Sequence, residues 1–133
     1  MNKTMSYICY GISFLGGGLS YLLGEWDVLL KSILCLVVLD YITGVLKAIY
    51  NKKLCSSAGV KGIIKKIVIF IMIAVANIIQ TILDDKIPLR EIIITFYIVN
   101  ESVSVIENAT QFIPVPEKIK KALMQIKEEN EEK

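Results

Sequence analysis

The chain has 133 residues, a length typical of one domain, and 54% of them are apolar, which exceeds the roughly 45–50% usual in soluble domains. Its net charge of +2 is too small to indicate nucleic-acid binding. The lack of histidine and the isolation of Cys9, Cys35 and Cys55 argue against a zinc site or a thiol-redox motif, so we expect free, packed thiols.

Four apolar segments follow one another along the chain. Two of them contain uncharged runs of 21 and 17 residues, within the range of about 17–25 residues that a helix needs to cross a bilayer. The first has no clean cleavage site of the small-x-small type, so we interpret it as a retained segment and not as a signal peptide. The predicted segments are residues 5–24, 28–49, 63–83 and 89–112.

Short polar connections separate these segments. Pro88 suits the first turn of a new helix, and the prolines of "PVP" end the fourth segment. We therefore predict an all-α integral membrane protein, a small bundle of about four transmembrane helices with a cytoplasmic amphipathic helix at the C-terminus. Residues 1–113 form the transmembrane domain and residues 114–133 the charged tail helix.

The first segment leaves alternatives open. Its Gly16-Gly17-Gly18 run lowers helix propensity, so the number of spans falls to three if this segment does not cross. Gly16, Ser20 and Gly24 also recur every four residues, a spacing that permits close helix packing in lipid but is equally consistent with loose turn chemistry.

The basic residues indicate an orientation. If all four segments span, twelve lysines lie on one side, and only Lys31, Lys86 and Arg90 lie on the other. Positively charged loops remain in the cytoplasm, so both termini are predicted to be cytoplasmic.

Polar residues within the second segment lie on one helical face. Asp40 stands mid-segment, with Thr43, Gly44 and Lys47 at i+3, i+4 and i+7. An aspartate at a helix centre costs about 2.5–3.5 kcal/mol on insertion, which the surrounding Leu, Ile and Val residues offset. Its carboxylate must then seek water or a partner, either as a polar contact between helices or as a pore-facing or assembly-controlling group.

The third and fourth segments repeat this pattern. Asn77 and Thr81 share a face of the third, and the polar residues of the fourth cover about a third of its circumference. Such a face either lines water or closes against another polar face, unless the helix lies on the membrane surface. The candidates on the fourth segment are Asn100, Glu101, Ser104, Glu107, Asn108 and Gln111.

Two blocks of sequence stand out: "LDYITGVLKAIYNKKLCSSAGVKGIIKK" (39–66) and "FYIVNESVSVIENATQFIPVPEKIKKAL" (96–123). Both resemble the toxin secretion/phage lysis holin family, and the resemblance covers about residues 25–127. Phe112-Ile113 stands where family members often have a glycine before the P-x-P. The resemblance adds a loop motif to the candidate positions: Ser57, Gly59, Gly62, Lys65 and Lys66.

The resemblance implies a small, non-enzymatic protein of the bacterial cytoplasmic membrane. Such proteins form homo-oligomers in the lipid bilayer and open lesions through which an endolysin or a large toxin leaves the cell, without necessary direct contact with that cargo. No cofactor, metal or nucleic acid is implied. The residue pattern also argues against an enzyme, since the paired carboxylates come with no histidine and no glycine-rich phosphate loop for catalysis. The alternatives are a small multi-helix transporter or ion channel, and a passive membrane scaffold.

Overall fold

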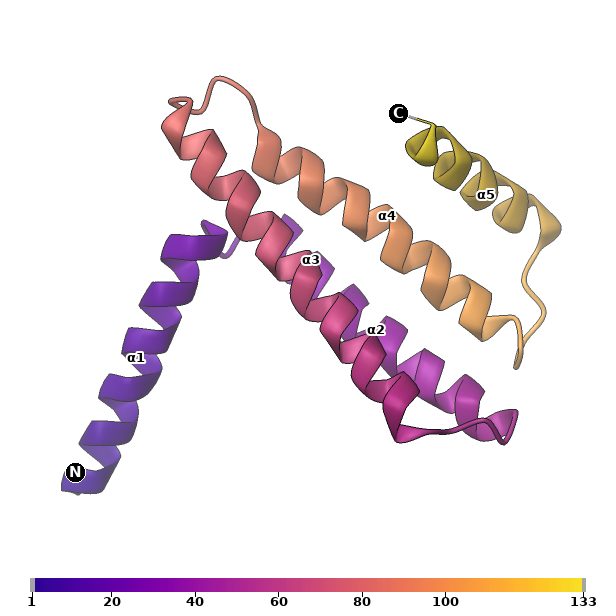
Figure 1. Cartoon of the computed structure of the whole chain (residues 1–133), viewed down its shortest axis with the longest axis horizontal. Helices are drawn as coiled ribbons and strands as arrows, with labels where there is room; N and C mark the ends of the chain where they lie inside the picture. Colours follow the sequence, from indigo (N-terminus) through magenta and orange to yellow (C-terminus); the bar gives the residue numbers. More distant parts are fainter. Residues whose placement is uncertain (1, 133) are drawn as a thin grey trace.

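The computed structural model describes residues 2–132, and over that range it contains helices and no strands (Figure 1). The all-α prediction is therefore confirmed. The elements are α1 (Lys3–Leu23), α2 (Val28–Tyr50), α3 (Ser56–Ile82), α4 (Leu89–Ala109) and α5 (Glu117–Glu131).

The core lies between α2, α3 and α4, which run side by side (Figure 1). Leu30, Ile33 and Val37 of α2 are buried at helical spacing, so they form one face. Ile73 of α3 and Ile94 of α4 are fully buried against that face. This three-helix bundle places the polar faces of α2 and α4 against each other.

The outside of the bundle is apolar. Large aliphatic side chains are exposed along the length of α2 and α3, which in water would be unfavourable but in lipid is the expected surface. By length and composition, α1, α2 and α3 are suited to cross a membrane. Of the four predicted segments, the one not among these three is α4, which carries two charged residues in its first turn as well as Glu101 and Glu107. By length and composition α4 is thus the weaker candidate, while the number of helices that cross stays a prediction.

Helix α3 begins at Ser56, seven residues before the predicted start at residue 63. The apolar pattern marks only the part of a helix that faces lipid, whereas the backbone continues as helix through the Ser-, Gly- and Lys-rich stretch. The first turns of α3 are consequently exposed and carry Lys61 and Lys65 on their surface. Helix α4 ends at Ala109, three residues before the predicted end at residue 112.

Helix α1 points away from the bundle, and only the C-terminal end of α1 approaches α3 (Figure 1). Leu23 is buried there, while Tyr7, Tyr10 and Phe14 are exposed further along. No side chain lies within 4 Å of where a Cβ at Gly16 would stand, so this part of the small-residue spacing makes no close helix contact within the chain.

Gly24 makes the turn between α1 and α2. Its φ of 82° and ψ of −163° belong to a region that essentially only glycine adopts. A Cβ at this position would lie 2.6 Å from Arg90 Nε and 2.9 Å from Asn77 Oδ1. Trp26 Nε1 donates a hydrogen bond to Ser20 Oγ across the same turn, at 2.9 Å. Turn chemistry, and not helix packing, explains Ser20 and Gly24.

Helix α5 folds back beside the C-terminal half of α4 (Figure 1). Leu123 and Met124 line a small cavity with Val103 and Ile106 of α4, and Val103 is buried. Lys127 Nζ also lies 4.0 Å from a carboxylate oxygen of Glu107. The tail is therefore helical, and it covers the outer side of α4.

We predict that Gly24→Ala destabilises the protein by about 1–3 kcal/mol, since alanine must adopt a strained conformation and displace Arg90. Gly17→Ala is the matched control: it lies inside α1 in open space, so alanine should be neutral or stabilising by up to about 1 kcal/mol. Unfolding of both variants in detergent, followed by circular dichroism, tests this. Equal stability of the two would contradict it.

Candidate functional site: polar contacts inside the bundle

An ion cluster joins the three bundle helices near their middle. Lys66 of α3 places its Nζ against Asp40 Oδ2 of α2 and against Glu101 Oε2 of α4. All three side chains are largely shielded, with exposures of 16% for Lys66, 11% for Asp40 and 9% for Glu101. One ammonium group thus serves two carboxylates in an apolar surrounding, and we refer to Asp40, Lys66 and Glu101 as the central triad.

Asn108 and Thr43 extend the triad. Asn108 Nδ2 donates to Asp40 Oδ1 at 3.2 Å and to Thr43 Oγ1 at 3.1 Å. Thr43 Oγ1 lies 2.9 Å from the carbonyl oxygen of Leu39, to which it can donate. Gly44 lies beside this contact, since a Cβ there would stand 3.7 Å from Asn108 Nδ2, at van der Waals distance. The polar faces predicted for the second and fourth segments therefore meet in the chain.

Energetically, the cluster is an interdependent unit. A buried ion pair contributes little net stability, but the loss of one partner leaves an uncompensated charge at a cost of about 3–5 kcal/mol. Here Lys66 is shared, so its removal would leave both Asp40 and Glu101 without a counter-ion. The triad is a constraint on how the helices pack more than a source of stability.

The other candidates of the fourth segment divide between the inside and the outside of the bundle. Asn100 and Ser104 are partly buried, whereas Glu107 and Gln111 are exposed. Glu107 faces Lys127 of α5 and takes no part in the triad. Within one chain, the polar face of α4 thus closes against other polar side chains, through Glu101 and Asn108, and does not line water.

The remaining candidate of the second segment, Lys47, is partly buried near the end of α2.

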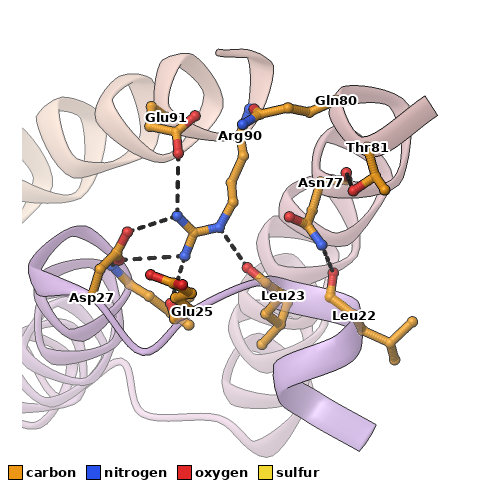
Figure 2. Close-up of polar contacts among 10 residues, drawn as sticks. Leu22, Leu23, Glu25, Asp27, Asn77, Gln80, Thr81, Arg90 and Glu91 are labelled. Atoms are coloured by element: carbon orange, nitrogen blue, oxygen red, sulfur yellow. Dashed lines mark hydrogen bonds and ion pairs between the residues drawn. The ribbon is translucent and has the colours of Figure 1, made fainter. Parts of the chain in front are cut away.

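Asn77 and Thr81 lie at the opposite end of the bundle. Asn77 Nδ2 donates to the carbonyl oxygens of Tyr21 and Leu22, at 3.3 and 3.1 Å, and so holds the last turn of α1 (Figure 2). Thr81 Oγ1 donates to the Asn77 carbonyl oxygen of its own helix at 2.9 Å. The structure does not bring either residue to the triad.

Arg90 forms a second polar centre at that end, and the sequence did not indicate it (Figure 2). Its side chain is only 4% exposed. The guanidinium donates to Asp27 Oδ2 at 2.8 Å, to the Leu23 carbonyl oxygen at 2.6 Å and to the Glu25 carbonyl oxygen at 2.8 Å. These bonds fasten the α1–α2 turn to the start of α4.

Two further side chains, Asp27 and Gln80, tie Arg90 to the helix ends around it. Asp27 also caps α2, with Oδ1 accepting from Leu30 N at 2.9 Å, and Gln80 Oε1 accepts from the backbone N–H of Arg90 at 2.8 Å. The hydrogen bonds from Arg90 lower the pKa of Asp27 below its usual value. A cation in the first turn of a helix is opposed by the helix dipole. That unfavourable position was the available signal that Arg90 must have a partner elsewhere.

The residues of the loop motif lie in the first turns of α3. Gly59 and Gly62 face Tyr41 of α2, where an added Cβ would lie 3.5 and 3.6 Å from its side chain. Ser57 and Lys65 are exposed, and only Lys66 joins the triad. A hydrogen bond with the Ser57 hydroxyl lowers the pKa of the Cys55 thiol.

The structure gives no indication of a metal centre among residues 2–132: no three cysteine, aspartate or glutamate side chains in this range are grouped to hold an ion. The Asp40 and Glu101 carboxylates are instead engaged by Lys66.

Comparison with known proteins gives a consistent result. A model described as the bacteriophage holin family matches residues 17–128. The chain is 40% identical over 128 residues to an uncharacterized 14.9 kDa protein of Clostridium perfringens, covering 95% of this chain and 97% of that one. It is 37% identical over 115 residues to a probable holin of Bacillus phage phi105, covering 86% and 84%. No solved structure matches.

We predict that Lys66→Met lowers the free energy of unfolding by about 3–5 kcal/mol, because two carboxylates lose their counter-ion. Lys61→Met is the control: Lys61 lies on the same helix but is exposed, so its effect should stay within about 0.5 kcal/mol. Unfolding in mixed detergent micelles measures both. The triple variant Asp40→Asn/Lys66→Met/Glu101→Gln should recover part of the loss, and a failure of Lys66→Met to destabilise would refute the triad.

Proposed function

The chain belongs to the bacteriophage holin family, and on this premise we propose that it assembles with copies of itself in the bacterial cytoplasmic membrane and opens lesions there. The lesions would release an endolysin that lyses the host, or export a large toxin, without direct contact between the holin and this cargo. The proposal needs no catalytic step and no cofactor. Family membership and the similarity to a probable phage holin support it.

The observation that carries the proposal is the central triad inside a bundle whose outer surface suits lipid. Asp40, Lys66 and Glu101 come from three different helices and satisfy one another. Lipid offers no hydrogen bonds, so these groups cannot face it without a partner. A corresponding helix of a second copy offers the same partners. The polar contacts that hold the helices of one chain together can thus also form between helices of different chains.

This exchange suggests how a harmless protein becomes a lesion. While copies are few, each bundle is closed and presents aliphatic side chains to lipid. As copies accumulate, α4 of one chain can take the place of α4 in another. A ring of chains joined in this way turns part of its polar face, including Asn100 and Ser104, towards water. The bilayer is then replaced by a polar wall over that area.

The direction of insertion is also a proposal. The ends of α2 and α4 and the start of α3 lie at one end of the bundle (Figure 1). That end carries the lysine-rich connection and leads into α5, so we place it, together with both termini, in the cytoplasm. In this arrangement α4 also crosses the membrane, with its charges turned towards α2 and α3 or placed near its ends.

Inducible expression in a bacterial host, together with a cytoplasmic cell-wall hydrolase, tests the function. We expect a sudden collapse of membrane potential, reported by a potential-sensitive dye, followed by lysis. Glu101→Leu should delay or abolish lysis, because it removes a triad partner, whereas Glu107→Leu, outside the triad, should change timing much less. A leak of ions without release of protein would instead support a small channel or transporter, and no effect on growth a passive scaffold.

Cysteine labelling tests the orientation. In a background with the three native cysteines replaced by serine, a reagent that cannot cross the membrane should label Asp85→Cys in intact cells and should label Ser57→Cys only after permeabilisation. Asp85 lies between α3 and α4, and Ser57 lies at the start of α3. The reverse pattern would overturn the proposed direction. Labelling of Asn2→Cys from outside would show that α1 does not span.

A further inference from the structure

A cavity of about 280 Å³ opens between α2, α3 and the loop that connects them, on the loop side of the central triad. It contains the glycines of the loop motif, for which lesion formation gives no role. The lining residues are Asp40, Tyr41, Gly44, Val45, Ala48, Lys53, Leu54, Cys55, Ala58, Gly59, Gly62, Lys65, Lys66, Ser104 and Asn108.

The cavity has an excess of positive charge. Three lysines and one aspartate line it. At the inner end the Lys66 ammonium group is engaged by Asp40 and Glu101. The excess positive charge therefore comes from Lys53 and Lys65. Among the side chains that the structure describes, Lys53 and Lys65 at the outer end have no ion-pair partner. Two ammonium groups are therefore free to bind an anion, and the Asp40 carboxylate repels that anion from the inner end.

Part of the cavity wall is apolar. Val45 and Ala48 of α2, Leu54 of the loop and Ala58 of α3 contribute to it. Gly59 and Gly62 stand opposite the Tyr41 ring, where side chains larger than a methyl group would occupy the space. The site thus combines an apolar interior with a cationic mouth. That combination fits an anionic amphiphile better than a small hydrated anion.

We propose that this cavity binds the headgroup phosphate of an anionic phospholipid, with Lys53 and Lys65 holding the phosphate and the first carbons of the lipid lying against the apolar walls. Basic pockets between transmembrane helices on the cytoplasmic side are suited to such headgroups. A soluble phosphate ester carries the same charged group but lacks the chains that the walls would cover. The proposal concerns a step before lesion formation: the α2–α3 connection would be fixed to the anionic leaflet.

The test uses full-length protein in a neutral detergent, titrated with short-chain phosphatidylglycerol and followed by native mass spectrometry. Glycerol 3-phosphate and short-chain phosphatidylcholine are titrated in parallel. Phosphatidylglycerol should bind at least tenfold more tightly than either. Equal affinity for glycerol 3-phosphate would overturn the lipid assignment, and equal affinity for phosphatidylcholine would overturn the role of net charge.

Paired variants locate the site. Lys53→Gln/Lys65→Gln should weaken phosphatidylglycerol binding about tenfold. Lys52→Gln/Lys61→Gln removes the same charge from the same loop and helix, but neither residue lines the cavity, so binding should change less than twofold. Equal losses in both double variants would show diffuse surface attraction and refute the cavity. Gly62→Leu, which fills the space without changing charge, should weaken binding as well.

These measurements do not depend on lysis. Purified protein that binds phosphatidylglycerol in the predicted way but opens no lesions would refute the proposed function and leave the site standing. Lysis with no selective lipid binding would do the reverse.

Discussion

The contact of one ammonium group with two carboxylates, in the middle of an apolar bundle, constrains the rest of this protein. Lys66 reaches both Asp40 and Glu101, and these residues come from three helices. A charge in lipid without a partner is so costly that the helices must either keep this arrangement or find an equivalent one in another molecule. The side-by-side packing of α2, α3 and α4 and the hydrogen bonds of Asn108 agree with this requirement.

The bundle therefore differs from a soluble one in where its polarity lies. Aliphatic side chains cover much of its outside, and its most shielded charged groups form two interior layers, one around Lys66 and one around Arg90. A soluble bundle that loses its packing exposes apolar surface and aggregates. A bundle of this kind that loses its packing exposes polar surface inside a membrane, which favours association and the entry of water. Membership of the holin family agrees with that behaviour.

Helical periodicity predicted much of this from the sequence, because it depends only on residue spacing. It placed Asp40, Thr43 and Gly44 on one face and Glu101 and Asn108 on another, and the structure brings these faces together. It did not separate Glu107 from Glu101, since that depends on where α5 lies. The family resemblance listed Lys66 only as a position of the loop motif, because neither the motif nor the spacing shows that its side chain reaches Asp40 and Glu101 on two other helices. Arg90 was overlooked because its partners, Asp27 and the backbone of the α1–α2 turn, are remote in sequence.

Each of the two interior layers needs one residue of α4, and this has a consequence for biosynthesis. Asp40 and Lys66 are present together once α2 and α3 have left the ribosome, and they form a neutral pair that a helical hairpin can carry into the bilayer. Arg90 and Glu101 are translated later, and both belong to α4. Neither layer can be completed before that helix emerges. Translation order thus delivers first a hairpin with one neutral interior pair, and last the two residues of α4 that complete the interior layers.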